Sequence, residues 1–404
     1  MLFGMKLLGT NTFRLSLATC AAINFLIGTA TAGPFTQLVV FGDSVSDVGN
    51  IAQATLGIYP GEVYYEDRFS NGPVFVEALS SGLGLGPPGR STAGGNVFAF
   101  GGAQTSGTGG LNGLFIRDVD EQVDQFFASR TPDPNALFVV YAGSNDLVNG
   151  QSNANIPVAN LAEDIGRLVT AGARNFLVPN LPLLGHTPRF NDSPSTLATY
   201  NGRTSQFNVA LAAMLDNLEV TNPTLSITRL DVAALFSEAL AQPESFGLTN
   251  VTDAAAPGLE PGDSSYDTNQ IAPNANEYMF WDDLHPTATV HAVLNQRALS
   301  LFTVPGDYNQ NRLVDAADYI VWRDTLGQSG ADLAADGNGD RQIDAADFSV
   351  WRTNFGATVV SATASTLAPV PEPATALISS IVLFASRFVR IRRSISRSEM
   401  ATLV

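Results

Sequence analysis

The chain has 404 residues, of which 45% are hydrophobic and 15% are charged, and its formal net charge is −17. A chain of this length and hydrophobic content buries at least one full core, which excludes a wholly disordered protein. The excess of acidic residues disfavours a nucleic-acid partner, because binding to a phosphate backbone needs clustered Lys and Arg.

The first 32 residues have the composition of an export signal. Lys6 and Arg14 are their only charged residues, an apolar run covers 15–28, and the small residues 30–32 match a cleavage site. We therefore predict a signal peptide over residues 1–32. The sole cysteine, Cys20, lies inside it, so cleavage after Ala32 would leave a protein without a thiol or disulfide.

The segment that follows alternates strand-like and helix-like patterns. Apolar, β-rich runs occur at 36–41, 96–100, 136–142, 174–179 and 225–230, each bounded by Gly, Pro, Asn or Asp. Apolar residues recur at helical spacing in 158–172 and 204–220, and a last helix is expected to begin near Pro286. Repeated strand and helix units predict a parallel sheet with helices on both faces.

The first predicted strand ends in the sequence "FGDSVSD" (41–47). Gly, Asp and Ser favour turns, so one interpretation is simply a turn. The other is that Ser44 is a nucleophile, since open α/β sheets bind ligands at the carboxyl ends of their strands. A serine nucleophile needs a base, a group that orients the base, and hydrogen-bond donors for the oxyanion.

The chain contains three histidines that could serve as this base. His186 lies in a Pro-rich loop with no acidic residue close in sequence, and His291 falls inside the last predicted helix. His285 follows Asp282 by three residues in "WDDLHPT". A carboxylate at that spacing can bond the second imidazole nitrogen and hold its tautomer, so His285 is the best candidate base.

Two further strand ends supply candidate donors. The run "NVFAFGGAQT" ends at Gly101 and Gly102, where the missing side chains let a backbone N–H approach a ligand. The run "FVVYAGSNDL" ends near Asn145, which carries a side-chain amide. We expect Ser44, Gly102 and Asn145 to share one rim of the sheet. The chain has no GxSxG sequence, which argues against the α/β-hydrolase elbow.

The four blocks "FGDSVSD", "NVFAFGGAQT", "GSND" and "DDLH", in this order, resemble the SGNH or GDSL hydrolase family over roughly residues 35–303, and we predict a hydrolase domain over 33–303. The resemblance implies a three-layer α/β/α, flavodoxin-like fold with a five-stranded parallel sheet. It also implies a serine esterase that needs no cofactor for catalysis. The catalytic residues that it implies are Ser44, Gly102, Asn145, Asp282 and His285.

In that family pattern Ser44 attacks the ester, His285 is the general base and then the acid, and Asp282 orients it. The N–H groups of Ser44 and Gly102 and the Asn145 side chain form the oxyanion hole. Gly101 competes with Gly102 for its role, and Asp283 competes with Asp282.

Residues 304–357 contain a repeat with a period of 29 residues: "GDYNQNRLVDAADYIVWRDTLG" (306–327) and "ADGNGDRQIDAADFSVWRTNFG" (335–356). Oxygen-bearing residues alternate in each copy and end in a carboxylate at position 12, as in a calcium loop of the EF-hand type. The expected calcium ligands are Asp307, Asn309, Asn311, Leu313, Asp315 and Asp318 in the first loop, and Asp336, Asn338, Asp340, Gln342, Asp344 and Asp347 in the second. Leu313 and Gln342, at position 7, would bind through their backbone carbonyls.

This pair resembles a type I dockerin, a small helical module that binds two calcium ions and whose family partner is a cohesin. Position 6 of each loop departs from the usual Gly, because Arg312 and Arg341 stand there. A small domain that calcium holds together without recruiting a partner is an equal interpretation. Trp322 and Trp351 occupy matching positions and are expected in the module's core.

A linker is predicted over 358–373, followed by a tail over 374–404 in which a short apolar stretch precedes several arginines. With the Pro-Glu-Pro just before it, the tail resembles the PEP-CTERM sorting signal of Gram-negative bacteria. The resemblance implies an exported protein of the cell envelope or extracellular matrix, held in the membrane until a sorting protease removes the tail. An ordinary C-terminal anchor is the alternative.

Three functions are compatible with these patterns. The first is an exported esterase or lipase acting on acyl or acetyl esters of a lipid or polysaccharide. The second is a cell-surface adhesion or scaffold protein in which the dockerin-like module is the working part. The third is a degenerate esterase that binds glycan without cleaving it. The complete set of candidate catalytic residues favours the first.

Overall fold

The computed structural model describes residues 35–309, 311, 313–330, 333–338, 340 and 342–358. The predicted signal peptide, the tail over 374–404, nearly all of the predicted linker, and Arg312 and Arg341 lie outside the described residues. Within the part that is described, no helix is both long and apolar enough to span a membrane.

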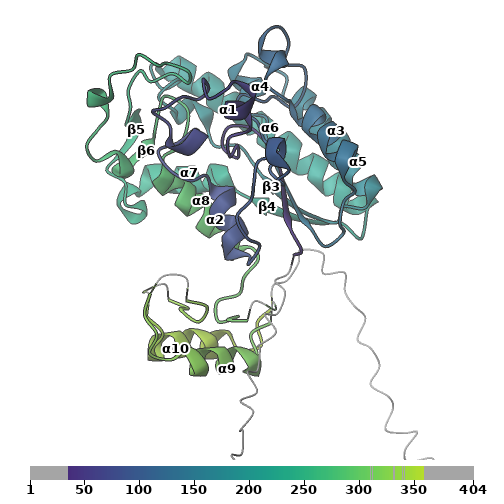
Figure 1. The fold of residues 1–404 in the computed structure, drawn as a ribbon, viewed down its shortest axis with the longest axis vertical. Helices are drawn as coiled ribbons and strands as arrows, with labels where there is room; N and C mark the ends of the chain where they lie inside the picture. Colours follow the sequence, from purple (N-terminus) through teal and green to yellow (C-terminus); the bar gives the residue numbers. More distant parts are fainter. Residues whose placement is uncertain are drawn as a thin grey trace, which may run out of the picture.

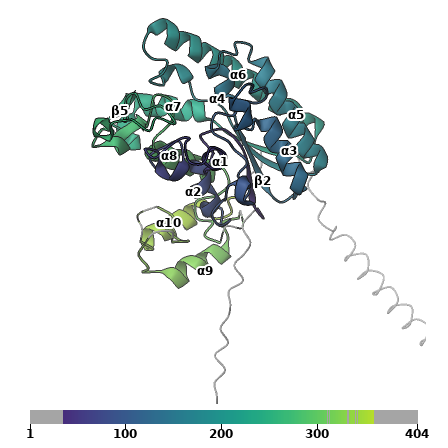
Figure 2. The same ribbon diagram turned by 45° about the horizontal axis from the view of Figure 1, so that its top comes forward.

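Four parallel strands form the central sheet in the order β1-β2-β3-β4: β1 (Leu38–Gly42), β2 (Leu137–Tyr141), β3 (Asn175–Pro179) and β4 (Ser226–Leu230). Helices cover both faces (Figures 1 and 2), with α3 (Val119–Ser129), α5 (Asn155–Ala171) and α6 (Pro194–Thr221) on one side. On the other lie α2 (Phe75–Gly82), α7 (Val232–Ala241) and α8 (Ala288–Ser300). The predicted three-layer α/β/α arrangement is therefore confirmed.

Shorter elements complete the hydrolase part. The helices are α1 (Asn50–Ala54) and α4 (Ser144–Val148), and β5 (Asn250–Ala254) pairs in parallel with β6 (Tyr278–Phe280). Single 3-10 turns are η1 (Tyr65–Asp67), η2 (Ser91–Ala93), η3 (Asn112–Leu114), η4 (Leu184–His186), η5 (Pro243–Phe246), η6 (Thr268–Gln270) and η7 (Ala275–Glu277).

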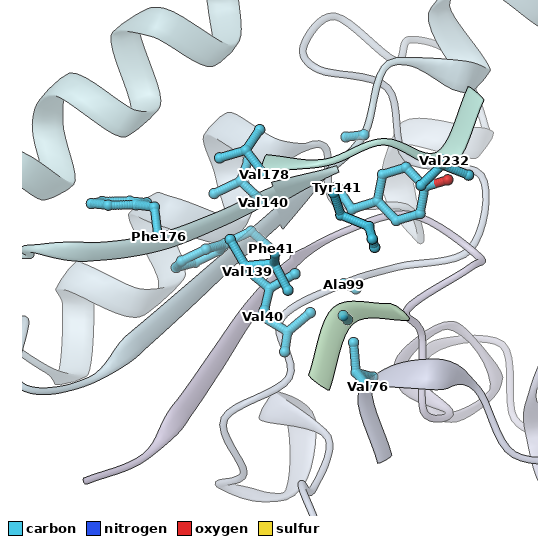
Figure 3. Packing of buried hydrophobic residues seen from close by; sticks show 14 of the residues in the cluster. Val40, Phe41, Val76, Ala99, Val139, Val140, Tyr141, Phe176, Val178 and Val232 are labelled. Atoms are coloured by element: carbon cyan, nitrogen blue, oxygen red, sulfur yellow. The ribbon is translucent and has the colours of Figure 1, made fainter. Parts of the chain in front are cut away.

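The two strands that carry the first and third sequence blocks are buried along their whole length. Burial on both faces is what a parallel sheet between helical layers requires, and it explains why β1 and β2 are nearly continuous apolar runs. Figure 3 shows this core, with Val40 and Val139 of the sheet, Val76 of α2 and Val232 of α7. The buried strands hold their carboxyl ends in fixed positions, where the candidate catalytic residues begin.

The prediction of a fifth strand is wrong. Residues 96–100 run beside β1, but only Val97 forms an isolated bridge with Val40. Val97 also bridges Arg90, and the Asn50 side-chain amide donates to the carbonyl oxygens of Val97 and Ala99 at 2.8 and 2.9 Å. On the β1 side the N–H groups of Val40, Phe98 and Phe100 donate to the carbonyls of Asn96, Val40 and Gly42 at 3.0, 2.7 and 3.2 Å. On the outer side the Asn50 side chain stands where a further strand would pair. The segment still lies beside β1 and brings the glycine pair to the rim.

The predicted helix over 204–220 begins earlier, at Pro194 in α6. The Ser193 hydroxyl accepts a hydrogen bond from the Thr196 N–H at 3.2 Å, and Pro194 occupies the first turn, where no N–H is needed. Capping chemistry therefore extends the helix beyond the region where apolar spacing reveals it. The other two predicted helices agree with α5 and α8 to within a few residues.

The repeat at 304–357 forms two matching helices, α9 (Ala316–Thr325) and α10 (Ala345–Asn354), which pack beside each other (Figure 1). Tyr308, Ala335 and Ile343 form a buried apolar cluster in it, and Trp322 and Trp351 pack against them, half-buried. Each indole N–H donates to a backbone carbonyl of the other copy: Trp322 to Asp344 and Trp351 to Asp315, at 2.7 and 2.8 Å. The two tryptophans thus join the repeats, as predicted for core residues.

Candidate active site

The candidate nucleophile follows β1 without a break. A Cβ at Gly42 would lie 2.3 Å from the Tyr141 carbonyl oxygen, so only glycine lets β1 end this close to β2. The Gln122 side chain fixes the same residue, accepting from the Gly42 N–H at 2.9 Å and donating to its carbonyl at 2.8 Å. Ser44 therefore leaves the sheet from a strand end that is held on both sides.

Three predicted residues form one chain of hydrogen bonds. The Ser44 Oγ lies 2.9 Å from His285 Nε2, and His285 Nδ1 lies 2.7 Å from Asp282 Oδ2. Asp282 is fully buried, and Ser44 and His285 are only 5% and 7% exposed. Residues 241 positions apart in the sequence thus meet with the geometry of a serine, a base and an orienting carboxylate.

Asp282 is held in its ionised form. Burial alone would raise the pKa of Asp282, but the charge of His285 and the hydrogen bonds from His285 and Tyr64 outweigh burial and lower it below the ordinary 3.8. Its Oδ1 accepts the backbone N–H groups of Leu284 and His285 at 2.8 and 2.6 Å. The carboxylate therefore stays charged and fixed while the imidazole gains or loses a proton.

The competing residues lie elsewhere. Asp283 accepts a hydrogen bond from Arg189 Nε at 2.8 Å, so its carboxylate is paired away from His285. His291 is buried in α8, where its Nδ1 accepts the Phe75 N–H at 3.2 Å, and His186 lies in η4. Burial lowers the pKa of His291 to about 3. Neither histidine occupies the position beside Ser44 that His285 fills.

The glycine pair separates into two roles. The Gly101 N–H donates to Asp47 Oδ2 at 2.7 Å, whereas the N–H groups of Gly102 and Ser44 donate to no acceptor within the described residues. Gly102 has φ +81°, where a side chain is strained, and a Cβ there would lie 2.9 Å from Ile116 Cδ1 and would have to displace it. The two unpaired N–H groups, unlike that of Gly101, are available to an oxyanion.

Asn145 lines the same cavity as Ser44 and His285, at the start of α4. One of its amide N–H groups donates to the Ala103 carbonyl at 2.9 Å, which ties α4 to the glycine turn. An amide nitrogen carries two N–H groups, so the second is available to a ligand. The structure therefore brings Ser44, His285, Asp282 and Asn145 together, with Gly102 on the adjoining turn.

Two buried carboxylates hold the loops that carry these donors. Asp47 accepts four backbone N–H groups, from Gly49, Asn50 and Ile51 in addition to Gly101. Asp146 accepts the N–H and hydroxyl of Thr105 at 2.9 and 2.7 Å. Asp47 thus links the turn after Ser44 to the glycine pair, and Asp146 links α4 to the segment that follows that pair. Sequence reasoning treated neither as part of the site.

Tyr64 contacts the candidate site through Asp282, and the sequence analysis did not predict this contact. Its hydroxyl donates to Asp282 Oδ2 at 2.7 Å, the same oxygen that bonds His285. Burial and the Asp282 charge raise the pKa of Tyr64 far above its ordinary 10, so it remains a donor. The two residues are 218 positions apart, and no sequence motif connects them.

We expect Tyr64→Phe to move the acidic limb of the pH–rate profile to higher pH by about one unit, with only a small loss of kcat at the optimum. The Tyr64 hydrogen bond favours charged Asp282, so its loss makes the carboxylate more basic and stabilises the imidazolium of His285. A kcat/KM profile against pH measures this shift. Tyr59→Phe is the matched control, and an unmoved limb in Tyr64→Phe would contradict the role.

Four buried carboxyl groups give the fold an unusual pH dependence. Burial raises the pKa of Asp43 and Asp164 to about 7, and of Asp47 and Asp146 to about 6. The folded protein thus holds protons that the unfolded chain has lost, so stability falls as pH rises from the ordinary pKa of 3.8 and stops falling once the pH is well above these folded values. The lowered pKa of His291 makes stability rise with pH, but only below about pH 6.5, the ordinary pKa of histidine.

We therefore expect the Tm to fall by a few degrees between pH 6.5 and 8, at a cost of about 1 kcal/mol for each group near 7. Asp164→Asn, on α5, should reduce this slope, because it removes one of those groups. Thermal unfolding at both pH values, followed by circular dichroism, measures the effect. A Tm that rises over the same interval would refute it.

The two candidate calcium loops share several internal hydrogen bonds. The position-12 carboxylates are buried and accept loop N–H groups through both oxygens, Asp318 from Asn309 and Asp315, and Asp347 from Asn338 and Asp344 among others. The donor types suit calcium. Within the described residues, however, no three Asp, Glu, His or Cys side chains lie close enough together to hold a metal.

Comparison with known proteins agrees with the geometry. The model of a family described as GDSL-like Lipase/Acylhydrolase matches residues 38–298. A phosphatidylcholine-sterol acyltransferase of Aeromonas hydrophila is 27% identical over 311 residues, which is 65% of this chain and 89% of that protein. The esterase EstA of Pseudomonas aeruginosa is 28% identical over 346 residues, covering 72% of this chain but 51% of EstA.

Among solved structures, an acetylxylan esterase from Geobacillus stearothermophilus matches 66% of this chain and 94% of its own, with 13% identity and a TM-score of 0.35. The fold and the Ser44–His285–Asp282 chain define a hydrolase that acts on ester bonds. With the family model matching well over half of its length, the protein belongs to the GDSL-like lipase and acylhydrolase family.

Proposed function

We propose that the protein is an exported serine esterase that cleaves carboxylic esters through an acyl-enzyme. The observation that carries this proposal is the unbroken hydrogen-bonded chain from Ser44 through His285 to Asp282. It lies beside backbone N–H groups of Ser44 and Gly102 that have no partner among the described residues.

In the first step Ser44 Oγ attacks the ester carbonyl while His285 Nε2 takes its proton. The carbonyl oxygen becomes negative, and the N–H groups of Ser44 and Gly102 and the Asn145 amide donate to it. His285 then gives the proton to the departing alcohol, which leaves Ser44 acylated. Water, deprotonated by His285, attacks the acyl group in the same way and releases the acid.

Hydrolysis of p-nitrophenyl esters from acetate to palmitate tests this function. The full chain should release p-nitrophenol from at least one ester, and Ser44→Ala should remove that release while leaving the fold intact. Activity that survives in Ser44→Ala, or a folded wild-type protein that cleaves no ester, would refute the proposal.

Export rests on the sequence at the two ends. The supporting features are the apolar run and small residues within 1–32 and the Pro-Glu-Pro, apolar and arginine-rich order near the C-terminus. Together they support a protein of the Gram-negative cell envelope whose tail a sorting protease recognises. Mass spectrometry of the protein from its native host would test both ends, and an intact chain would count against both signals.

We also propose that the duplicated module binds two calcium ions. The supporting observations are the matched Asp and Asn donors and the hydrogen bonds that the two position-12 carboxylates accept in the same way. A cohesin-like partner is a further possibility that the dockerin resemblance alone supports. The residues that would hold the ions, at loop positions 1, 3, 5, 7, 9 and 12, are Asp307, Asn309, Asn311, Leu313, Asp315 and Asp318 in the first loop and Asp336, Asn338, Asp340, Gln342, Asp344 and Asp347 in the second.

Chelation with EGTA is expected to abolish the tertiary structure of this module, because a domain this small depends on its metal to fold. Near-UV circular dichroism of Trp322 and Trp351, which join the two loops, would report the loss. Esterase activity should remain unchanged, since the catalytic residues require no metal. A module signal that is insensitive to both EGTA and added calcium would contradict the proposal.

A further inference from the structure

A small apolar cavity lies next to the candidate nucleophile. Its volume is about 40 Å³, and beside Ser44 and His285 it is walled by Pro182, Leu184, Phe236 and Leu294. A space of 10–15 Å³ on this measure holds one water, so the cavity has room for about three groups of that size. It is therefore large enough for a few methylene groups but not for a sugar ring.

A second apolar cavity of about 10 Å³ lies between α7, η5, β6 and α8. Phe246 and Val290 are among the residues that line it. Phe236 belongs to the walls of both cavities and is the residue that these two cavities share. Its ring is buried, and its centroid lies 6.4 Å from that of Phe280.

The two helices that form these walls lie side by side in Figures 1 and 2. Leu294 of α8 faces the cavity next to Ser44, and Val290, one helical turn earlier, faces the second cavity. The cavities are therefore successive spaces along the same α7–α8 interface. The Phe236 ring separates them.

Resting on the proposed esterase function, we propose that the first cavity holds the acyl chain of the ester and that Phe236 is its floor. The apolar walls favour an aliphatic chain, because burying methylene groups there releases them from water. A sugar or glycerol group would leave its hydroxyls unpaired against Leu184 and Phe236. The leaving alcohol consequently lies on the open side, and Phe236 limits the acyl group to about four carbons.

The test compares kcat/KM of the full chain on p-nitrophenyl acetate, butyrate, octanoate and palmitate. The wild type should prefer acetate or butyrate to octanoate by tenfold or more, since methylene groups that fit or fail to fit a pocket change rates by that order. Phe236→Ala joins the two cavities, so the octanoate-to-butyrate ratio should rise at least tenfold. Phe236→Leu, a milder change, should raise the ratio in the same direction.

Phe246→Ala is the matched control. It removes an aromatic ring from the second cavity alone, so it should leave the acyl-chain profile unchanged. If the wild type is active and both Phe236→Ala and Phe236→Leu keep its acyl-chain profile, this inference is overturned and the esterase function stands. A folded wild type without activity on any ester would overturn the proposed function, and this inference with it.

Discussion

Asp282→Asn is expected to lower kcat by about 10⁴-fold with little change in KM. The amide can donate to His285 Nδ1, which places the imidazole proton on Nε2. In that tautomer His285 cannot take the proton of Ser44, although the 2.9 Å distance between them persists. Activity should recover partly at high pH, where hydroxide can take over the role of the base.

Asp283→Asn is the control for this substitution. The neighbouring carboxylate bonds Arg189 and not His285, so its neutralisation should change kcat by no more than a few-fold. Steady-state kinetics on the best p-nitrophenyl ester, with circular dichroism of each variant, would separate catalysis from folding. Equal losses in the two variants would mean that Asp282 acts through the local fold and not through His285.

The sequence predicts the site better than the sheet, for a physical reason. Ser44, His285 and Asp282 follow short motifs whose chemistry limits the choice to few residue types, so three histidines could be reduced to one. The run at 96–100 has the composition of a strand, but it forms only one bridge with β1, and the Asn50 side chain instead of a neighbouring strand occupies its outer edge. Composition contains no information on such a contact.

Other features depend on contacts between residues far apart in the chain. The choice between Gly101 and Gly102 rests on the Asp47 carboxylate, which takes the Gly101 N–H. The link from Tyr64 to Asp282 joins a loop before α2 to the turn before α8. The cavity beside Ser44 is lined by residues from α7, α8 and the loop after β3. None of these neighbours can be inferred from spacing in one sequence.

Asn145→Ala is expected to lower kcat by about 10²–10³-fold, because it removes one donor to the oxyanion. KM should change little, since the donor gains most of its strength when the carbonyl oxygen becomes negative. The same side chain donates to the Ala103 carbonyl at 2.9 Å, so part of the loss could come from a displaced glycine turn. The two causes need a control that separates them.

Asn160→Ala supplies that control. Asn160 donates to the Thr105 hydroxyl at 3.0 Å, so it supports the same loop without lining the cavity at Ser44. Asp146 retains both of its bonds to Thr105 in either variant, which keeps the loop attached. A loss in kcat confined to Asn145→Ala would assign Asn145 to the oxyanion hole. Comparable losses would mean that it positions the turn, with the N–H groups of Ser44 and Gly102 as the remaining donors.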